Sequence, residues 1–186
     1  MATIYIKPGS GSGSGTLSAP YFYDELATAE TAATAGGTIL FTDGDYELGA
    51  NFTWDGVGSS GNDITYESLT LKGAVIKSSV SGTPRTLSIG DTGNTSSINI
   101  KHFKFTDIKF TIANLGSGLF TGNEATTAPA GIAVDYFFNV ANSTGASKFT
   151  NNVFNIVRSS GNYFEQNCGD LAEWSGNTLY ISGISS

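Results

Sequence analysis

Paired carboxylates are the first candidates for chemistry, because they can hold calcium or act as the acid and base of glycoside cleavage. Asp43 and Asp45 flank Gly44 and could share a cation. Their spacing is half of a calcium loop, but the other ligands of such a loop are absent. The same residues fit a turn between Phe41 and Tyr46. We therefore predict a turn and keep Asp43 and Asp45 as the only metal candidates.

Basic and nucleophilic residues offer no further catalytic set. The arginines are Arg85 and Arg158, and neither lies in a stretch rich in carboxylates. His102 is the sole histidine, no nucleophile-elbow motif accompanies it, and we predict that it points outward from a strand. Cys168, the only cysteine, excludes an internal disulfide and is predicted to be a packed, inert side chain. We predict no catalytic residue and no cofactor.

Exposed aromatic rings could bind a sugar through their faces. The candidates are Trp54, Trp174, Tyr163 and Tyr180. Trp174 occupies a repeated position that we assign to the core. We favour core packing for these rings over ligand contact. Trp54, which follows a threonine and precedes Asp-Gly, a turn context, is the one aromatic that we keep as a candidate for sugar contact.

A repeat defines the elements that must position these residues. Residues 105–112, 149–156 and 174–181 each read aromatic, small hydroxyl, turn-former, two free positions, large apolar, free, Ile. Residues 71–78 form a weaker fourth copy. A strand-and-turn repeat that returns after roughly 20 to 50 residues predicts a β-solenoid, with irregular spacing taken up by loops. The longest loop is predicted at residues 121–129.

The residue type at the turn position differs among the copies of the repeat. Asp107 stands there in one copy, and its counterparts are Asn151, Gly176 and Gly73. A catalytic carboxylate would not be replaced in this manner. Asp, Asn and Gly all tolerate the left-handed backbone, so we predict a left-handed turn residue at this position.

The N-terminal part differs from the repeats. Residues 4–6 predict a strand, residues 9–15 a flexible Gly/Ser loop, and residues 20–35 an amphipathic helix that Gly36-Gly37 ends. A strand then follows in AGGTILFTDGDY, residues 35–46. We expect a single domain in which residues 1–48 are an N-terminal strand, loop, capping helix and first coil, and residues 49–186 are β-helix coils.

This opening resembles the N-terminal cap of right-handed parallel β-helix proteins of the pectate-lyase-like superfamily, including small phage virion β-helix proteins. The resemblance implies an all-β, right-handed parallel β-helix with an N-terminal capping α-helix. It carries little about function, because that fold hosts lyases, hydrolases, adhesins and viral fibres.

Composition narrows the function classes. The net charge is −7 and the nine basic residues are scattered, which argues against binding to nucleic acid or to an anionic membrane. The N-terminus lacks the features of a signal peptide, and no apolar run is long enough to span a membrane. We expect a protein made in a host cytoplasm that stays there or leaves without a cleaved signal.

These observations favour a non-enzymatic structural protein of a virus particle, a phage capsid decoration (cement) or tail protein. We expect a homo-oligomer, most simply a trimer, and contact with other virion proteins such as the major capsid protein. The end after residue 181 lacks a helical plug, so we expect a partner to close it. The alternatives are a polysaccharide lyase, hydrolase or tailspike-like depolymerase of the same group, and a carbohydrate- or surface-binding module.

Overall fold

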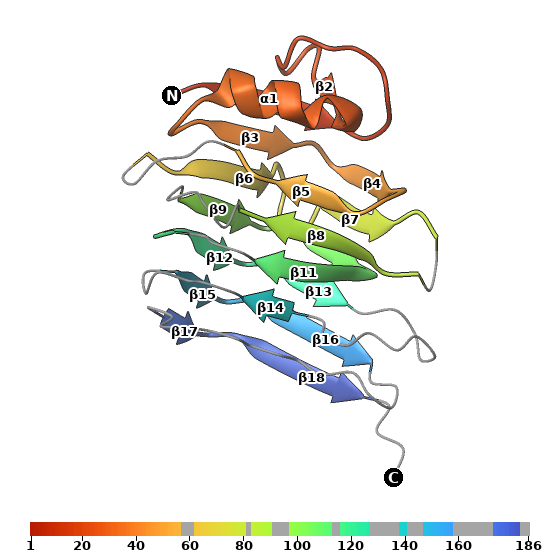
Figure 1. Cartoon of the computed structure of the whole chain (residues 1–186), viewed down its shortest axis with the longest axis vertical. Helices are drawn as coiled ribbons and strands as arrows, with labels where there is room; N and C mark the ends of the chain where they lie inside the picture. Colours follow the sequence, from red (N-terminus) through yellow and green to blue (C-terminus); the bar gives the residue numbers. More distant parts are fainter. Residues whose placement is uncertain are drawn as a thin grey trace.

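The described part of the chain forms an all-β structure of parallel sheets with one short α-helix (Figure 1). The structure is a computed structural model and describes residues 1–56, 62–80, 83–90, 97–112, 116–126, 138–140, 147–157 and 173–182. Cys168, Arg158 and Tyr163 lie outside these residues, so the predictions made for them stay predictions.

Three parallel sheets contain the strands of the described residues. The first sheet has the spatial order β17(Glu173–Ser175), β15(Lys148–Thr150), β12(Leu119–Thr121), β9(Ile98–Lys101), β6(Ile64–Ser68), β3(Thr38–Phe41), β1(Thr3–Lys7), β2(Tyr21–Phe22). The second has the order β18(Thr178–Ser182), β16(Val153–Val157), β13(Glu124–Thr126), β10(Lys104–Thr106), β7(Ala74–Ser78), β4(Gly44–Leu48). The third has the order β14(Phe138–Val140), β11(Ile108–Ile112), β8(Arg85–Ile89), β5(Phe52–Trp54).

From β3 to β16 the chain visits the three sheets in a fixed order, and β17 and β18 then extend the first and second sheets. We call one such passage a circuit. Each strand pairs in register with the equivalent strand of the next circuit, so inward-facing side chains form columns. One column contains Ile100, Phe120, Phe149 and Trp174. The alternation of buried and partly exposed residues along β7 and β11 follows from this geometry.

The repeat of the sequence corresponds to the corner between the first and second sheets. Phe149 and Trp174 are register partners, and so are Phe154 and Leu179. However, Phe105 pairs with Ala125 in the second sheet, so the predicted copy at residues 105–112 belongs to a different corner. The true counterpart of the Phe149 copy begins at Phe120. In its sequence Ala125 replaces the large apolar residue of the other copies, and Thr127 replaces the final Ile.

Left-handed backbone occurs at the corners as predicted. Asp107, Asn151 and Gly176 have φ angles of 58°, 56° and 63°. In the fourth copy the left-handed residue is Lys72, with φ 61°, rather than the predicted Gly73. Gly73 is required for another reason, because a Cβ there would lie 2.1 Å from Asp43 Oδ1.

Two predicted elements need correction. The loop predicted at residues 121–129 instead contains the end of β12 and all of β13, because the register with the next circuit outweighs its Gly, Thr and Asn content. The helix predicted over residues 20–35 is shorter: β2 and the 3-10 helix η1(Tyr23–Glu25) precede α1(Leu26–Ala33). The Glu25 carboxylate accepts hydrogen bonds from the N–H groups of Phe22 and Gly13, both at 3.0 Å, which holds this segment outside the helix.

The helix α1 packs across one end of the sheets, against β1, β2 and β3 (Figure 1). Its buried face contains Leu26, Ala29 and Ala33, which are at most 1% exposed. These residues belong to the same core cluster as Phe154, near the other end of the chain. One continuous core therefore joins the cap to the circuits.

Candidate functional site

The metal candidates are already engaged by side chains of the neighbouring circuit. Asp43 Oδ1 accepts a hydrogen bond of 2.7 Å from Thr70, and Asp45 Oδ2 pairs with Lys77 Nζ at 2.7 Å. Asp45 lies inside β4 rather than in the predicted turn. Among the described residues, no three His, Cys, Asp or Glu side chains gather in a way that could hold a metal ion.

Trp54 does not lie on the surface, contrary to the sugar-contact prediction. Its side chain is 0% exposed, and its ring stacks on Tyr66 with 5.0 Å between centroids and an interplanar angle of 7°. The indole N–H donates to the Tyr23 hydroxyl at 3.4 Å. A sugar has no access to this ring. Trp54 is the last residue of β5, and the third sheet directs its indole inward.

His102 lies in the corner after β9 rather than on a strand. It has a left-handed φ of 65°, and its Nδ1 is 3.2 Å from Glu67 Oε1. A second ion pair joins Lys72 Nζ to Glu124 Oε2 at 2.9 Å, and the backbone N–H of Lys72 donates to the carbonyl of His102. Arg85 lies in β8, and its backbone N–H donates to the backbone carbonyl of Asp107. Each of these contacts joins residues of different circuits.

A buried asparagine ladder was missed by the sequence reasoning. The N–H of Asn123 donates to Asn152 Oδ1 at 3.0 Å, and the N–H of Asn152 donates to Asn177 Oδ1 at 2.9 Å. The side-chain amides of Asn123, Asn152 and Asn177 donate to the carbonyls of Ile100, Phe120 and Phe149. The signal was present as an asparagine after the left-handed residue in three stacked corners: Gly122-Asn123, Asn151-Asn152 and Gly176-Asn177.

The ladder is structural rather than catalytic. Asn123 and Asn152 are 1% and 0% exposed, and each amide satisfies backbone groups that the corner leaves without a sheet partner. The separations are 29 residues from Asn123 to Asn152 and 25 from Asn152 to Asn177. Circuits of unequal length therefore meet at the same corner.

A second buried polar group links the cap to the circuits. Glu30 of α1 is 8% exposed and accepts a 2.5 Å hydrogen bond from the Tyr66 hydroxyl of β6. That hydroxyl in turn accepts from the N–H of Gly56 at 2.9 Å. Burial raises the pKa of Glu30 to about 7, against the opposing effect of the Tyr66 hydrogen bond.

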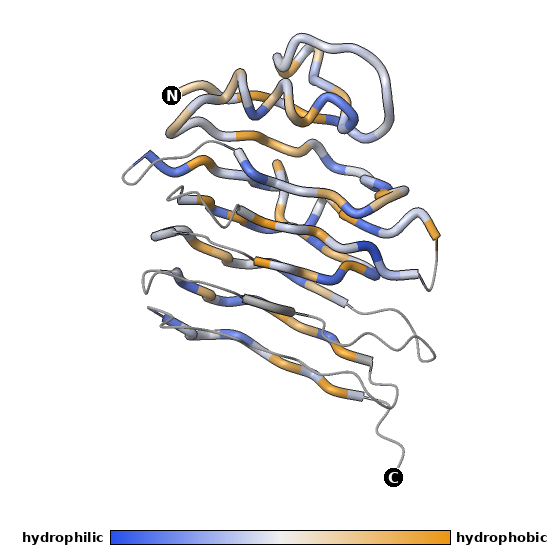
Figure 2. The backbone as a smooth tube through the Cα atoms, viewed as in Figure 1, coloured by the Kyte–Doolittle hydropathy of each residue, from blue (hydrophilic) through white to orange (hydrophobic). Residues whose placement is uncertain are grey.

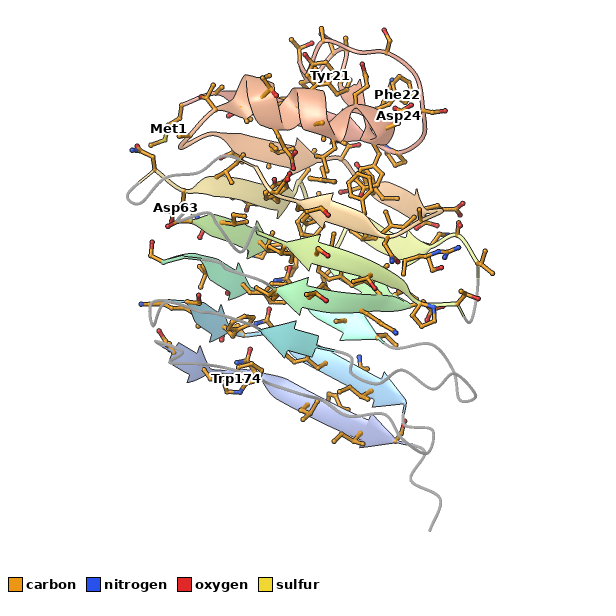
Figure 3. All side chains as sticks on the ribbon, viewed as in Figure 1. Met1, Tyr21, Phe22, Asp24, Asp63 and Trp174 are labelled. Carbon is orange, nitrogen blue, oxygen red and sulfur yellow. The ribbon has the colours of Figure 1, made fainter. Side chains whose placement is uncertain are left out.

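Apolar side chains at the C-terminal end are much more exposed than those in the core. We define the C-terminal apolar surface as Trp174, Leu179, Tyr180 and Ile181, which are 39%, 43%, 60% and 47% exposed. Figure 2 shows hydrophobic segments on β18, the outermost strand of the second sheet. Trp174 lies at this end in Figure 3, and its exposure contradicts its assignment to the core.

Exposure follows from position in the column rather than from residue type. The register partners of Trp174, Leu179 and Ile181 in the preceding circuit are Phe149, Phe154 and Ile156, which are at most 4% exposed. Among the described strands, β17 and β18 are the last in their sheets. No described strand pairs with their outer edges.

Neither a family model, nor a curated protein, nor a solved structure matches this chain. None of the described helices is long and apolar enough to cross a membrane.

Proposed function

We propose that the chain is a non-enzymatic structural protein of a virus particle, a phage capsid decoration (cement) or tail protein. One observation supports this most: the N-terminal end is covered by α1, whereas the C-terminal apolar surface is exposed at the sheet edge. Exposed apolar patches on soluble proteins mark places of association. A protein with one covered and one exposed end is suited to binding another subunit through its exposed end.

The architecture that we propose for this role is a right-handed parallel β-helix of the pectate-lyase-like group. The fixed order in which strands visit the three sheets supports it, and so does the in-register pairing of successive circuits. Such a rod is held by columns of side chains along its whole length. It can therefore project from a particle without a second domain.

The partner that we propose is another virion protein such as the major capsid protein, with homo-oligomers, most simply trimers, on the particle. The residue types of β18 suit it to pairing with a β-strand of another protein. Its five residues, Thr178–Ser182, include no charged residue and no proline. Charged residues and proline are what usually prevents an exposed edge strand from pairing with another chain. A neutral apolar edge strand can pair with a strand of another protein.

Co-sedimentation with particles tests this proposal. Particles from the genome that encodes the chain would be produced without this gene, purified, and mixed with the recombinant protein. We expect saturable binding that Leu179→Lys abolishes. The matched control is Leu17→Lys, because Leu17 is an exposed leucine, 62% accessible, in the N-terminal cap.

Two outcomes would contradict the proposal. One is equal loss of particle binding in Leu17→Lys and Leu179→Lys, which would show that the C-terminal apolar surface is not the docking surface. The other is release of unsaturated sugars from acidic polysaccharides in the presence of calcium. That product would instead favour the lyase alternative.

A further inference from the structure

A groove lies between the N-terminal cap and the first circuit, away from the C-terminal apolar surface. Its volume is about 660 Å³, within the range of small-ligand sites. The loop after β1 contributes Pro8, η1 contributes Tyr23 and Asp24, and the segment from β4 to β5 contributes Asp45, Glu47 and Phe52. Figure 3 labels Asp24 beside the cap, at the opposite end of the molecule from Trp174.

The apolar wall of the groove is fixed in place. The rings of Tyr23 and Phe52 stack with 5.1 Å between centroids and an interplanar angle of 29°. Tyr23 is 6% exposed and also contacts Tyr46 edge-on at 5.3 Å. Phe52 packs against the core but stays partly exposed at the groove. The groove thus offers an aromatic surface that needs little reorganisation to receive a ligand.

The rim of the groove is acidic. Asp24, Asp45 and Glu47 all line it, and no lysine or arginine is among its described lining residues. Lys77 pairs from the adjacent strand with Asp45 at 2.7 Å and with Glu47 at 3.3 Å. One lysine beside three carboxylates leaves the groove with a negative excess. The side chains of Asp45 and Glu47 remain 55% and 58% exposed, so both can also contact a ligand.

We propose that this groove binds an arginine side chain of a partner polypeptide. A guanidinium can stack on an aromatic face while its N–H groups donate to carboxylates, whereas an ammonium is a compact and more strongly hydrated charge. Phe52 and the three acidic residues line the same groove. This assignment is independent of docking at the C-terminal apolar surface.

A peptide titration of the full-length protein tests the assignment. The probe is N-acetyl-glycyl-arginine amide, and the neutral control is the same peptide with citrulline in place of arginine. Amide resonances of ¹⁵N-labelled protein would be followed at low ionic strength, because added salt screens exposed charge pairs. We expect saturable shifts at Tyr23, Asp24 and Glu47, and binding about tenfold tighter for arginine than for citrulline.

Two variants sharpen the test. Asp24→Asn with Glu47→Gln should weaken arginine binding about tenfold, since charge-assisted hydrogen bonds would be lost. Glu173→Gln, a carboxylate at the other end of the molecule, should leave it unchanged. Absence of saturable shifts, equal affinity for the two peptides, or shifts confined to other residues would overturn the proposal. The peptide comparison uses the unaltered chain, so it stands even if a variant fails to fold.

Discussion

The two ends of this molecule solve the same physical problem in different ways. Any set of parallel sheets has a first and a last edge, where strands lack partners and core side chains lack neighbours. At the N-terminal end, α1 covers the edge and leaves Leu26 only 1% exposed. At the C-terminal end, Leu179 is 43% exposed, although its register partner Phe154 is fully buried. The contrast indicates that burial depends on what lies beyond the edge, and it is the basis of our proposal that a partner covers the second end.

Matched leucine truncations should separate the two ends most strongly. Leu26→Ala removes fully buried apolar volume and should lower the free energy of unfolding by about 2 to 5 kcal/mol. Leu179→Ala removes a half-exposed side chain and should lower it by less than about 1 kcal/mol. Urea unfolding followed by circular dichroism measures both. Similar losses would mean that the ends are equally packed in solution.

The asparagine ladder allows a comparison between the interior and the open end. Asn152→Ala would leave the N–H of Asn123 and the carbonyl of Phe120 without their buried partner, at a cost of about 2 kcal/mol. Asn177→Ala should cost about 1 kcal/mol, because Asn177 is partly exposed and water can replace it. Denaturant midpoints of the two variants measure the difference. A larger effect at Asn177 would contradict the account.

The cap should respond to pH through Glu30, with an effect on the order of 1 kcal/mol. Burial raises the pKa of Glu30 to about 7 from an ordinary value of 4.5; the hydrogen bond from Tyr66 and the backbone hydrogen bond from Asp55 oppose this, and the charge of Asp55 adds to it. The folded protein therefore keeps this proton to higher pH than the unfolded chain does. Stability due to this group is present below about pH 4.5 and is lost as the pH rises towards about 7.

Glu30→Gln removes the titrating group while preserving an acceptor for the Tyr66 hydroxyl. Unfolding free energies measured at about pH 5 and about pH 8 should therefore converge in this variant relative to the unaltered protein. Glu67→Gln, in β6 next to Tyr66 but paired with His102, is the control for a general loss of charge. An unchanged pH dependence in Glu30→Gln would exclude Glu30 as the source.

Local backbone chemistry was predictable from the sequence where one residue decides it. The left-handed corners at Asp107, Asn151 and Gly176 follow from residue types that tolerate positive φ. The strand at residues 4–6 lies within β1, and the strand ending at Phe41 is β3. In each case a short pattern carries its own physical reason.

Features set by contacts between circuits were not predictable in the same way. Trp54 has a turn-like sequence context, and its inward direction depends on the pairing of β5 with β8. The copy at Phe105 belongs to a second corner with a similar pattern, whereas the true counterpart has Ala125 in place of a large apolar residue and Thr127 in place of Ile. Register is a tertiary property, and one-dimensional similarity does not fix it.

Amide hydrogen exchange of the free and the particle-bound protein tests the central claim most directly. Exchange reports local opening, and strands at an uncovered edge should exchange faster than strands covered by the cap. We expect β18 to exchange rapidly in the free protein and to become protected on the particle, while β1 and α1 stay unchanged. Protection that appears in the cap and not in β18 would contradict the claim that the C-terminal end is the docking surface.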